Sequence, residues 1–204
     1  MQLRQLDAFR ISALLLYREQ NAAFATPIDL IPFGQIENPP HEIAWPPDMD
    51  VLMNVTGYAD ALGSAAMVML AEDVVIRVAS IPGLAALKLI AWDDRGKIDA
   101  KDAHDLFTLL RRYSDAGNHD RLYNDHFAQI ESADYDPEMA GAWLLGADIV
   151  SMASEETLAA LNAILADERK VNLLMVHMAR SYHAENALTY IGKLLQQFTS
   201  GLVP

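Results

Sequence analysis

The chain has 204 residues, of which 52% are hydrophobic and 21% charged, so it is long enough to bury a core and has the composition of a folded globular protein. The absence of cysteine excludes disulfides and thiolate sites, and no apolar run reaches the roughly 18 residues that span a bilayer, so we expect a cytoplasmic, non-membrane protein. The net charge of −13 disfavours extended nucleic-acid binding, because the only basic concentrations are Lys88 to Lys101 and the pair Arg111–Arg112. A small phosphate-bearing ligand at one local site, or a basic protein partner, remains compatible with this charge.

The first part of the chain is predicted to form strands. Short apolar runs bounded by polar or turn-forming residues are typical of strands, and pairs of them predict hairpins. The runs comprise residues 14–17, 28–33, 51–55, 68–70 and 74–78. Residues 34–50 contain four prolines and are predicted to be an irregular loop.

From Ile81 onward the apolar residues recur with helical spacing. Ser80 and Pro82 open the first long helix, and Asp99 is the predicted N-cap of the second. Further helices are expected over residues 121–131, 137–152, 154–166, 171–177 and 184–198. Strands followed by helices predict an α+β fold, with a small mixed or antiparallel sheet in residues 1–79 and a helical lobe in residues 80–204.

Charged residues at helical spacing make the first candidate site. Lys88 and Arg95 are seven residues apart and project from one face of a helix, while Asp102 and Asp105 share a face of the next helix. Two cations facing two acids could bind a polyanion and a metal. The alternative is structural: solvated cations, an acid serving the helix dipole, and an ordinary pair between Lys101 and Asp105.

Two further groups of carboxylates could hold a metal. Asp29 interrupts an apolar strand, where a carboxylate is costly to bury unless it is paired or bound to metal, although it could also face solvent. Asp48 and Asp50 have the D-x-D spacing of a magnesium site, or simply form a turn before a strand. The histidines, serines and glycines form no zinc, serine-hydrolase or phosphate-loop motif.

Several segments together resemble a known family. IDLIPFG at residues 28–34, WPPD at 45–48, NVTGY at 54–58, VASIPGLAALKLIAWDDR at 78–95 and KDAHDLFTLL at 101–110 occur in the order found in AbiEii/AbiGii toxin-type nucleotidyltransferases. The resemblance covers roughly residues 12–113. It implies a fold of the DNA polymerase β-like superfamily, with a sheet that carries metal-binding acids and a helical C-terminal lobe. It also implies magnesium-assisted transfer of a nucleotidyl group from a nucleoside triphosphate.

The resemblance assigns roles to six residues of this chain. Asp29 matches a metal-binding catalytic carboxylate, and Asp105 matches an acid that acts as base or orients Lys88. Nucleotide binding is assigned to Lys88, which is also catalytic, and to Arg95, Lys101 and Asp102. Such transfers depend mainly on positioning phosphates and neutralising their charge, so clustered cations and carboxylates are the groups required.

The sequence departs from the family pattern upstream of Asp29. The family places a Gly-Ser motif and a D-x-D or D-x-E pair there, and residues 1–28 contain neither. We therefore expect an impaired nucleotidyltransferase, with a non-catalytic nucleotide-binding or protein-interaction protein of the same fold as the alternative. The expected partners are a nucleoside triphosphate, a protein antitoxin, and a second copy pairing through strand edges near residues 14–17 and 28–33.

Overall fold

The computed structural model describes residues 14–16, 27–29, 31–45, 49–96 and 99–203. The chain divides into two compact units, residues 1–55 and residues 56–204. The boundary between the units, at residues 55/56, lies before a short helix and a hairpin. The sequence pattern predicts the boundary at 79/80 instead, where strands give way to continuous helices. The helical lobe expected after residue 80 thus shares its unit with a strand pair.

The first unit contains two antiparallel strand pairs. The strands are β1 (Leu14–Leu16), β2 (Pro27–Asp29), β3 (Glu42–Trp45) and β4 (Val51–Asn54). Leu14 lies opposite Asp29 in the first pair, and Glu42 lies opposite Asn54 in the second. The prediction of an irregular loop through residues 34–50 was therefore wrong for β3, which pairing with β4 stabilises despite the flanking prolines.

A carboxylate closes the turn that leads into β3. Glu37 accepts hydrogen bonds from the backbone N–H groups of Gly34 at 2.6 Å and His41 at 2.9 Å. These bonds favour the charged form and lower the pKa of Glu37. The turn holds His41 at a φ of 68°, and the chain enters β3 directly afterwards.

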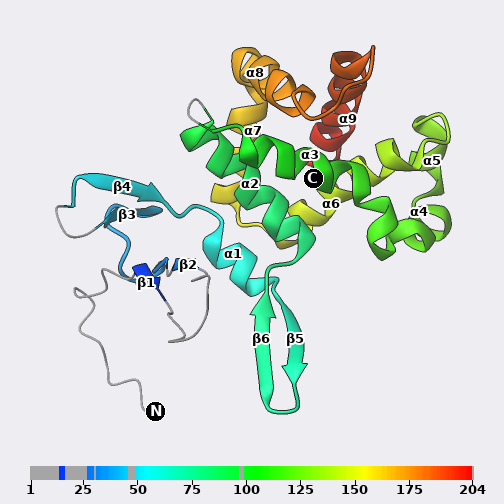
Figure 1. The fold of residues 1–204 in the computed structure, drawn as a ribbon. Helices are drawn as coiled ribbons and strands as arrows, with labels where there is room; N and C mark the ends of the chain where they lie inside the picture. Colours follow the sequence, from blue (N-terminus) through cyan, green and yellow to red (C-terminus); the bar gives the residue numbers. More distant parts are fainter. Residues whose placement is uncertain (1–13, 17–26, 30, 46–48, 97–98, 204) are drawn as a thin grey trace. The chain divides into compact units, whose positions relative to one another are not determined.

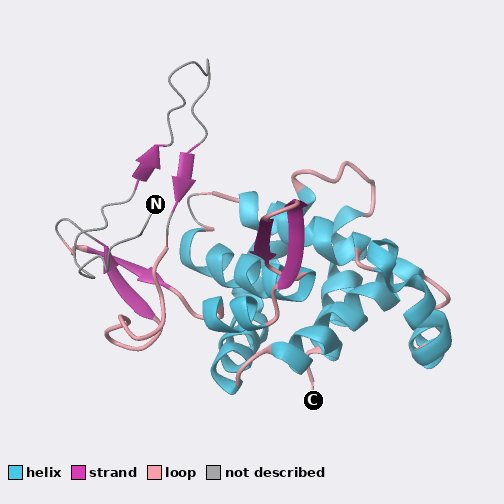
Figure 2. Ribbon diagram, turned by 90° about the horizontal axis from the view of Figure 1, so that it is seen from below, coloured by secondary structure: helices cyan, strands magenta, loops and turns pink. Residues whose placement is uncertain are grey.

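The second unit begins with a short helix and a hairpin and continues as helices (Figure 1). Its elements are α1 (Tyr58–Gly63), β5 (Ala66–Ala71), β6 (Val74–Val78), α2 (Ile81–Arg95), α3 (Lys101–Arg112), the kinked turn η1 (Ser114–Asn118), α4 (His119–Asp125), α5 (Phe127–Ser132), α6 (Pro137–Met152), α7 (Glu155–Ala166), α8 (Glu168–Ala179) and α9 (Ala187–Gly201). The predicted α+β class is confirmed. The strand pairs seen in Figure 2 are separate two-stranded antiparallel sheets in the described part of the chain.

Capping residues explain where three of these helices begin. Ser80 accepts a hydrogen bond from the N–H of Gly83 at 3.2 Å, and Ser154 caps α7 through the N–H of Thr157. Asp136 accepts from two N–H groups in the first turn of α6, which has a proline at its start. Each cap satisfies donors that have no partner within the helix. These local signals are why the predicted starts of α2, α6 and α7 agree with the structure.

The core of the second unit is built around α6. This helix packs against α9, α3 and α2, and it contributes Leu144, Leu145 and Ile149, each at most 1% exposed. Leu106 of α3 and Phe198 of α9 are fully buried in the same cluster. Full burial of one such side chain stabilises the fold by about 1.5–3 kcal/mol. No helix in the described residues is both long and apolar enough to cross a membrane.

The hairpin formed by β5 and β6 projects from the helices as an isolated ribbon (Figure 1). Most of its large apolar side chains are well exposed: Met67, Met69, Leu70, Val74, Val75, Ile76 and Val78 are between 40% and 70% exposed. A single two-stranded hairpin is marginally stable in water, so this ribbon is an exposed apolar surface that a partner could cover.

The closest helix contact in the core depends on glycine. A Cβ on Gly146 of α6 would overlap the carbonyl oxygen of Phe198, and a Cβ on Gly201 of α9 would overlap that of Trp143. We expect Gly146→Ala to lower the free energy of unfolding by about 3 kcal/mol, because backbone atoms must separate to make room. Urea unfolding followed by circular dichroism measures this loss. Gly63→Ala, where a Cβ meets no atom within 4 Å, is the matched control, and an equal effect of both changes would contradict the explanation.

Candidate functional site

The candidate site lies on the paired helices α2 and α3. The buried side of α2 is lined by Ala85, Leu89 and Trp92, and Lys88 lies one residue before Leu89 at the edge of that stripe. The buried side of α3 includes Leu106 and also Asp102. The two helices pack against each other, so the charged residues predicted on separate helices meet at their junction.

A carboxylate at this junction binds two cations. Asp102 accepts a hydrogen bond from Lys88 Nζ through Oδ1 at 2.9 Å and from Arg95 Nε through Oδ2 at 2.8 Å. Lys88 Nζ also donates to Asp105 Oδ2 at 2.6 Å. The Asp102 side chain is only 4% exposed, whereas Arg95 is 61% exposed. Asp102 is therefore the buried anchor, and Arg95 reaches into solvent.

Lys88, Arg95, Asp102 and Asp105 are called the cluster from here on, and its ionisation follows from these contacts. Burial alone would oppose the charged form of Asp102, but the hydrogen bonds from Arg95 and Lys88 outweigh it and lower the pKa of Asp102. Burial likewise opposes the charge on Lys88, and its bonds to Asp105 and Asp102 outweigh that effect and raise the pKa of Lys88. The hydrogen bond to Asp102 is the main cause of the raised pKa of Arg95. All three groups are thus held charged near neutral pH.

The structure brings four of the six predicted site residues together: Lys88, Arg95, Asp102 and Asp105. Lys101 is exposed, and its side chain makes no ion pair or hydrogen bond to any described residue, because Asp105 is bound to Lys88 instead. The predicted N-cap Asp99 is one residue early, because the N-cap of α3 is Ala100. The Asp99 carboxylate nevertheless accepts a hydrogen bond from the N–H of Lys101, the first residue of α3, at 2.9 Å.

The proposed metal ligands are not assembled in the described residues. Asp29 ends β2, and its side chain, like the whole of Asp48, lies outside what the structure describes. Both oxygens of Asp102 already bind cations, so this carboxylate does not fit a magnesium site. Among the described residues no group of three or more His, Asp or Glu side chains could hold a metal ion.

Tyr58, in the first turn of α1, is a neighbour of the cluster that the sequence reasoning missed. Burial is the main cause of its raised pKa, and the charges of Arg95 and Asp102 act on it as well. It is the last residue of the segment NVTGY, which contributed to the family resemblance. This motif was therefore the one feature of the sequence that could have pointed to Tyr58 as part of the site. No other pattern in the sequence linked residue 58 to the two helices.

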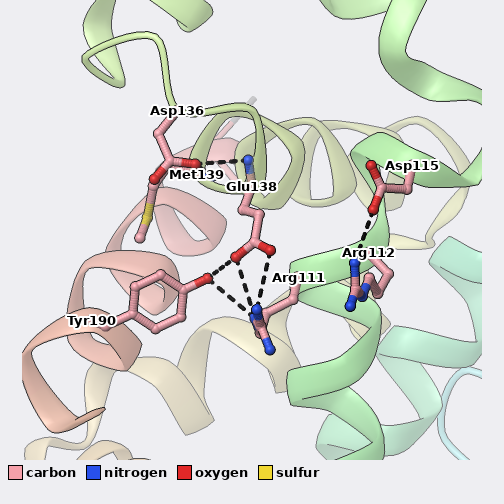
Figure 3. Close-up of polar contacts among 7 residues, drawn as sticks. All are labelled: Arg111, Arg112, Asp115, Asp136, Glu138, Met139 and Tyr190. Atoms are coloured by element: carbon pink, nitrogen blue, oxygen red, sulfur yellow. Dashed lines mark hydrogen bonds and ion pairs between the residues drawn. The ribbon is translucent and has the colours of Figure 1, made fainter. Parts of the chain in front are cut away.

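A second polar network, also unpredicted, joins α3, α6 and α9 (Figure 3). Arg111 donates to both oxygens of Glu138, from Nε at 3.2 Å and Nη2 at 3.1 Å, and the hydroxyl of Tyr190 donates to the same carboxylate. A third network joins Arg121, Asp148 and Tyr113. Its partners are 27 to 35 residues apart, so no local spacing could have revealed it.

Two ring side chains tie α2 to α8. The Trp92 Nε1–H group donates to Nδ1 of His177 at 3.1 Å in a buried contact. This bond requires Nδ1 to be unprotonated, and burial lowers the pKa of His177. The neutral ring therefore helps to hold α2 in position against α8.

Comparison with known families gives one match. A family model described as "Nucleotidyl transferase AbiEii toxin, Type IV TA system" matches residues 9–190, which is most of the chain. No curated protein and no solved structure matches the chain at a significant level. The matched range includes α2, α3 and all four residues of the cluster.

We expect Asp102→Asn to lower the free energy of unfolding by about 3 kcal/mol, because it leaves the partly buried Lys88 with a single carboxylate and removes the main partner of Arg95. Chemical unfolding of both proteins measures the difference. The control is Asp115→Asn, whose ion pair with Arg112 is 63% exposed on both sides and should contribute little. Similar losses in both variants would show that Asp102 is not the anchor.

The contribution of Asp102 should depend on pH in a defined direction. Because its pKa in the folded protein is lowered, the stabilisation is complete well above the unfolded value of about 3.9 and is lost as the pH falls below it. The stability gap between wild type and Asp102→Asn should therefore be constant from about pH 5 to 8 and shrink below about pH 4. Urea titrations across this range provide the test, and a gap that widens in acid would contradict the assignment.

Proposed function

Because the chain belongs to the AbiEii nucleotidyl transferase toxin family, we propose that it binds a nucleoside triphosphate and transfers its nucleotidyl group to an acceptor. The observation that supports this proposal most directly is the cluster on α2 and α3. It places a lysine and an arginine around one buried carboxylate, with a second carboxylate at its edge. Transfer enzymes of this kind act mainly by positioning phosphates and neutralising their charge.

Each residue of the cluster has a proposed role. Arg95 uses Nε for Asp102, so both of its terminal nitrogens can donate to phosphate oxygens in a charge-assisted contact. Lys88 contributes a positive charge that Asp102 and Asp105 hold in place. Asp102 is a positioning residue, because both of its oxygens are already engaged. Lys101, on the exposed side of α3, remains a proposed outer contact.

Asp105 is the carboxylate that an acceptor could reach. It is 33% exposed, compared with 4% for Asp102. In the proposed transfer, an acceptor hydroxyl attacks the α-phosphorus of the triphosphate, its proton passes to Asp105, and the bond to the leaving pyrophosphate breaks. The triphosphate is expected as its magnesium complex, and Asp29 remains a predicted metal ligand from the family resemblance. A protein antitoxin also remains a prediction from the family resemblance, and a cytoplasmic location remains a prediction from the composition.

A non-catalytic nucleotide-binding or protein-interaction role is the second candidate. The observation that favours it is the charge balance of the cluster. Two cations and two carboxylates neutralise one another, so the four residues also form a complete structural contact between α2 and α3.

Binding of the magnesium complex of each nucleoside triphosphate is the first test. We expect Lys88→Ala and Arg95→Gln each to weaken binding by about tenfold, since each removes a charge-assisted contact. Calorimetric titration measures the affinities, and circular dichroism checks that the variants fold. Lys193→Ala, an exposed lysine on α9, makes the same charge change as Lys88→Ala and should leave affinity unchanged. Equal affinities of all these proteins would remove the cluster from the binding site.

Transfer of label separates the two candidate functions. Wild type and Asp105→Asn are incubated with α-labelled triphosphates, magnesium or manganese, and pooled RNA or protein acceptors. Label transfer by wild type that is lost in Asp105→Asn would show that the chain is a nucleotidyltransferase and that Asp105 takes part in the reaction. Intact triphosphate binding without transfer by either protein identifies the non-catalytic alternative.

We also propose that a second copy of the chain pairs with β5. The strands first expected to form the dimer edge lie largely outside the described residues, but β5 is an edge strand of six uncharged residues, Ala66–Ala71. In an antiparallel pair of two β5 strands, Met67 would face Leu70 and Val68 would face Met69, so no like charges meet. Sedimentation at tens of micromolar should show self-association that Met69→Lys weakens. Asn124→Lys on α4 adds the same charge and should not weaken it, and a monomeric wild type would refute the pairing.

A further inference from the structure

The second basic feature of the chain lies at the other end of α3. Arg111 and Arg112 are adjacent cations, and the proposed transfer uses neither. They lie more than one turn after Asp105, and Arg112 shares a helical face with it, about 10 Å along the axis. Arg111 and Arg112 are therefore separate from the cluster formed with Asp102 and Asp105 at the start of α3.

A small cavity opens beside these arginines. It has a volume of about 200 Å³ and lies between α3 and the segment after α8. Its polar lining consists of His104, Thr108, Arg111, Arg112, Ser181 and Tyr182. Two of these side chains are arginines, and no carboxylate lines the cavity. That is unusual in a chain in which 28 acidic residues outnumber 15 basic ones.

The lining is held in place before any ligand arrives. The guanidinium of Arg111 lies 5.1 Å from the ring centroid of Tyr182 and 5.5 Å from that of Phe107, and Glu138 binds it on the side of α6. Its bonds to Glu138 use Nε and Nη2, which leaves further N–H groups of this five-donor side chain. His104 Nδ1 and the Ser181 hydroxyl lie 2.5 Å apart and join the two sides of the cavity.

Arg112 is the lining residue that can most easily exchange its present partner for a ligand. Its only ion pair in the described residues is with Asp115, three positions later, and both side chains are 63% exposed. Such surface pairs contribute little to stability, so Arg112 can exchange Asp115 for a ligand at small cost. His104, Thr108 and Arg112 also follow one another at intervals of four, which places them on one exposed stripe of α3.

We propose that this cavity binds a phosphate group, with Arg112 and Arg111 as the charged contacts. Planar guanidinium groups match the oxygens of a phosphate, and two arginines without a carboxylate in the lining favour an anion over a cation. The phosphate belongs either to a small phosphomonoester or to a nucleic-acid strand, since the two present the same chemical group. The proposal does not depend on nucleotidyl transfer, because it involves none of the four cluster residues on α2 and α3.

The test measures binding of inorganic phosphate, a nucleoside monophosphate and a short single-stranded RNA by NMR titration of the full chain without magnesium. Arg112→Gln should weaken binding by about tenfold, the effect of one lost charge-assisted contact. Ser181→Asp, which puts a carboxylate in the lining, should abolish it. Arg169→Gln, an exposed arginine in the first turn of α8, is the control, and Lys88→Ala should leave this binding intact.

The outcomes show which kind of phosphate ligand the cavity binds and whether binding occurs there or at Lys88. Binding of all three probes with loss in Arg112→Gln assigns the cavity to phosphomonoesters, and binding of RNA alone with the same loss assigns it to a strand. No binding of any probe, equal effects of Arg112→Gln and Arg169→Gln, or loss in Lys88→Ala instead of Arg112→Gln would overturn the proposal. Failure of triphosphate binding at Lys88 and Arg95 would leave it untouched.

Discussion

The contact on which the candidate site depends is the bond of one buried carboxylate to two cations. Asp102 is almost fully covered, and a buried charge of this kind is stable only when opposite charges and hydrogen bonds compensate for lost hydration. Lys88 and Arg95 provide both, and in doing so they fix the junction of α2 with α3. The position of each cation is therefore set by Asp102 rather than by its own long and flexible side chain.

The same arrangement recurs elsewhere in the helical lobe. Glu138 is held by Arg111 and Tyr190, and Asp148 is held by Arg121 and Tyr113. In each case a carboxylate on α6 accepts hydrogen bonds from an arginine and a tyrosine on other helices. Because α6 also supplies fully buried leucines and a glycine at the closest helix contact, it organises both the apolar core and the polar networks around it.

The neutral charge of the cluster has two consequences for function. It holds the cations ready without an exposed excess of positive charge, which suits a site that must position phosphates. It also means that a phosphate ligand has to compete with two carboxylates for the same N–H donors. Arg95 is the residue least affected by this competition, because its terminal nitrogens extend into solvent beyond Asp102.

The sequence by itself determined the α+β class, the family and the identity of the cluster. Caps at Ser80, Asp136 and Ser154 are local signals, and the seven-residue interval from Lys88 to Arg95 fixes a helical face without knowledge of the fold. It could not assign the strand Glu42–Trp45, because the prolines around it favour a loop and only pairing with β4 overrides them. Nor could it choose the partner of Asp105, since Lys101 at four residues' distance and Lys88 on another helix were equally possible. The packing of α2 against α3 made Lys88 the partner of Asp105. A similar long-range contact, between α3 and the segment after α8, formed the cavity beside Arg111. Contacts between helices depend on how their apolar faces pack, which local spacing does not encode.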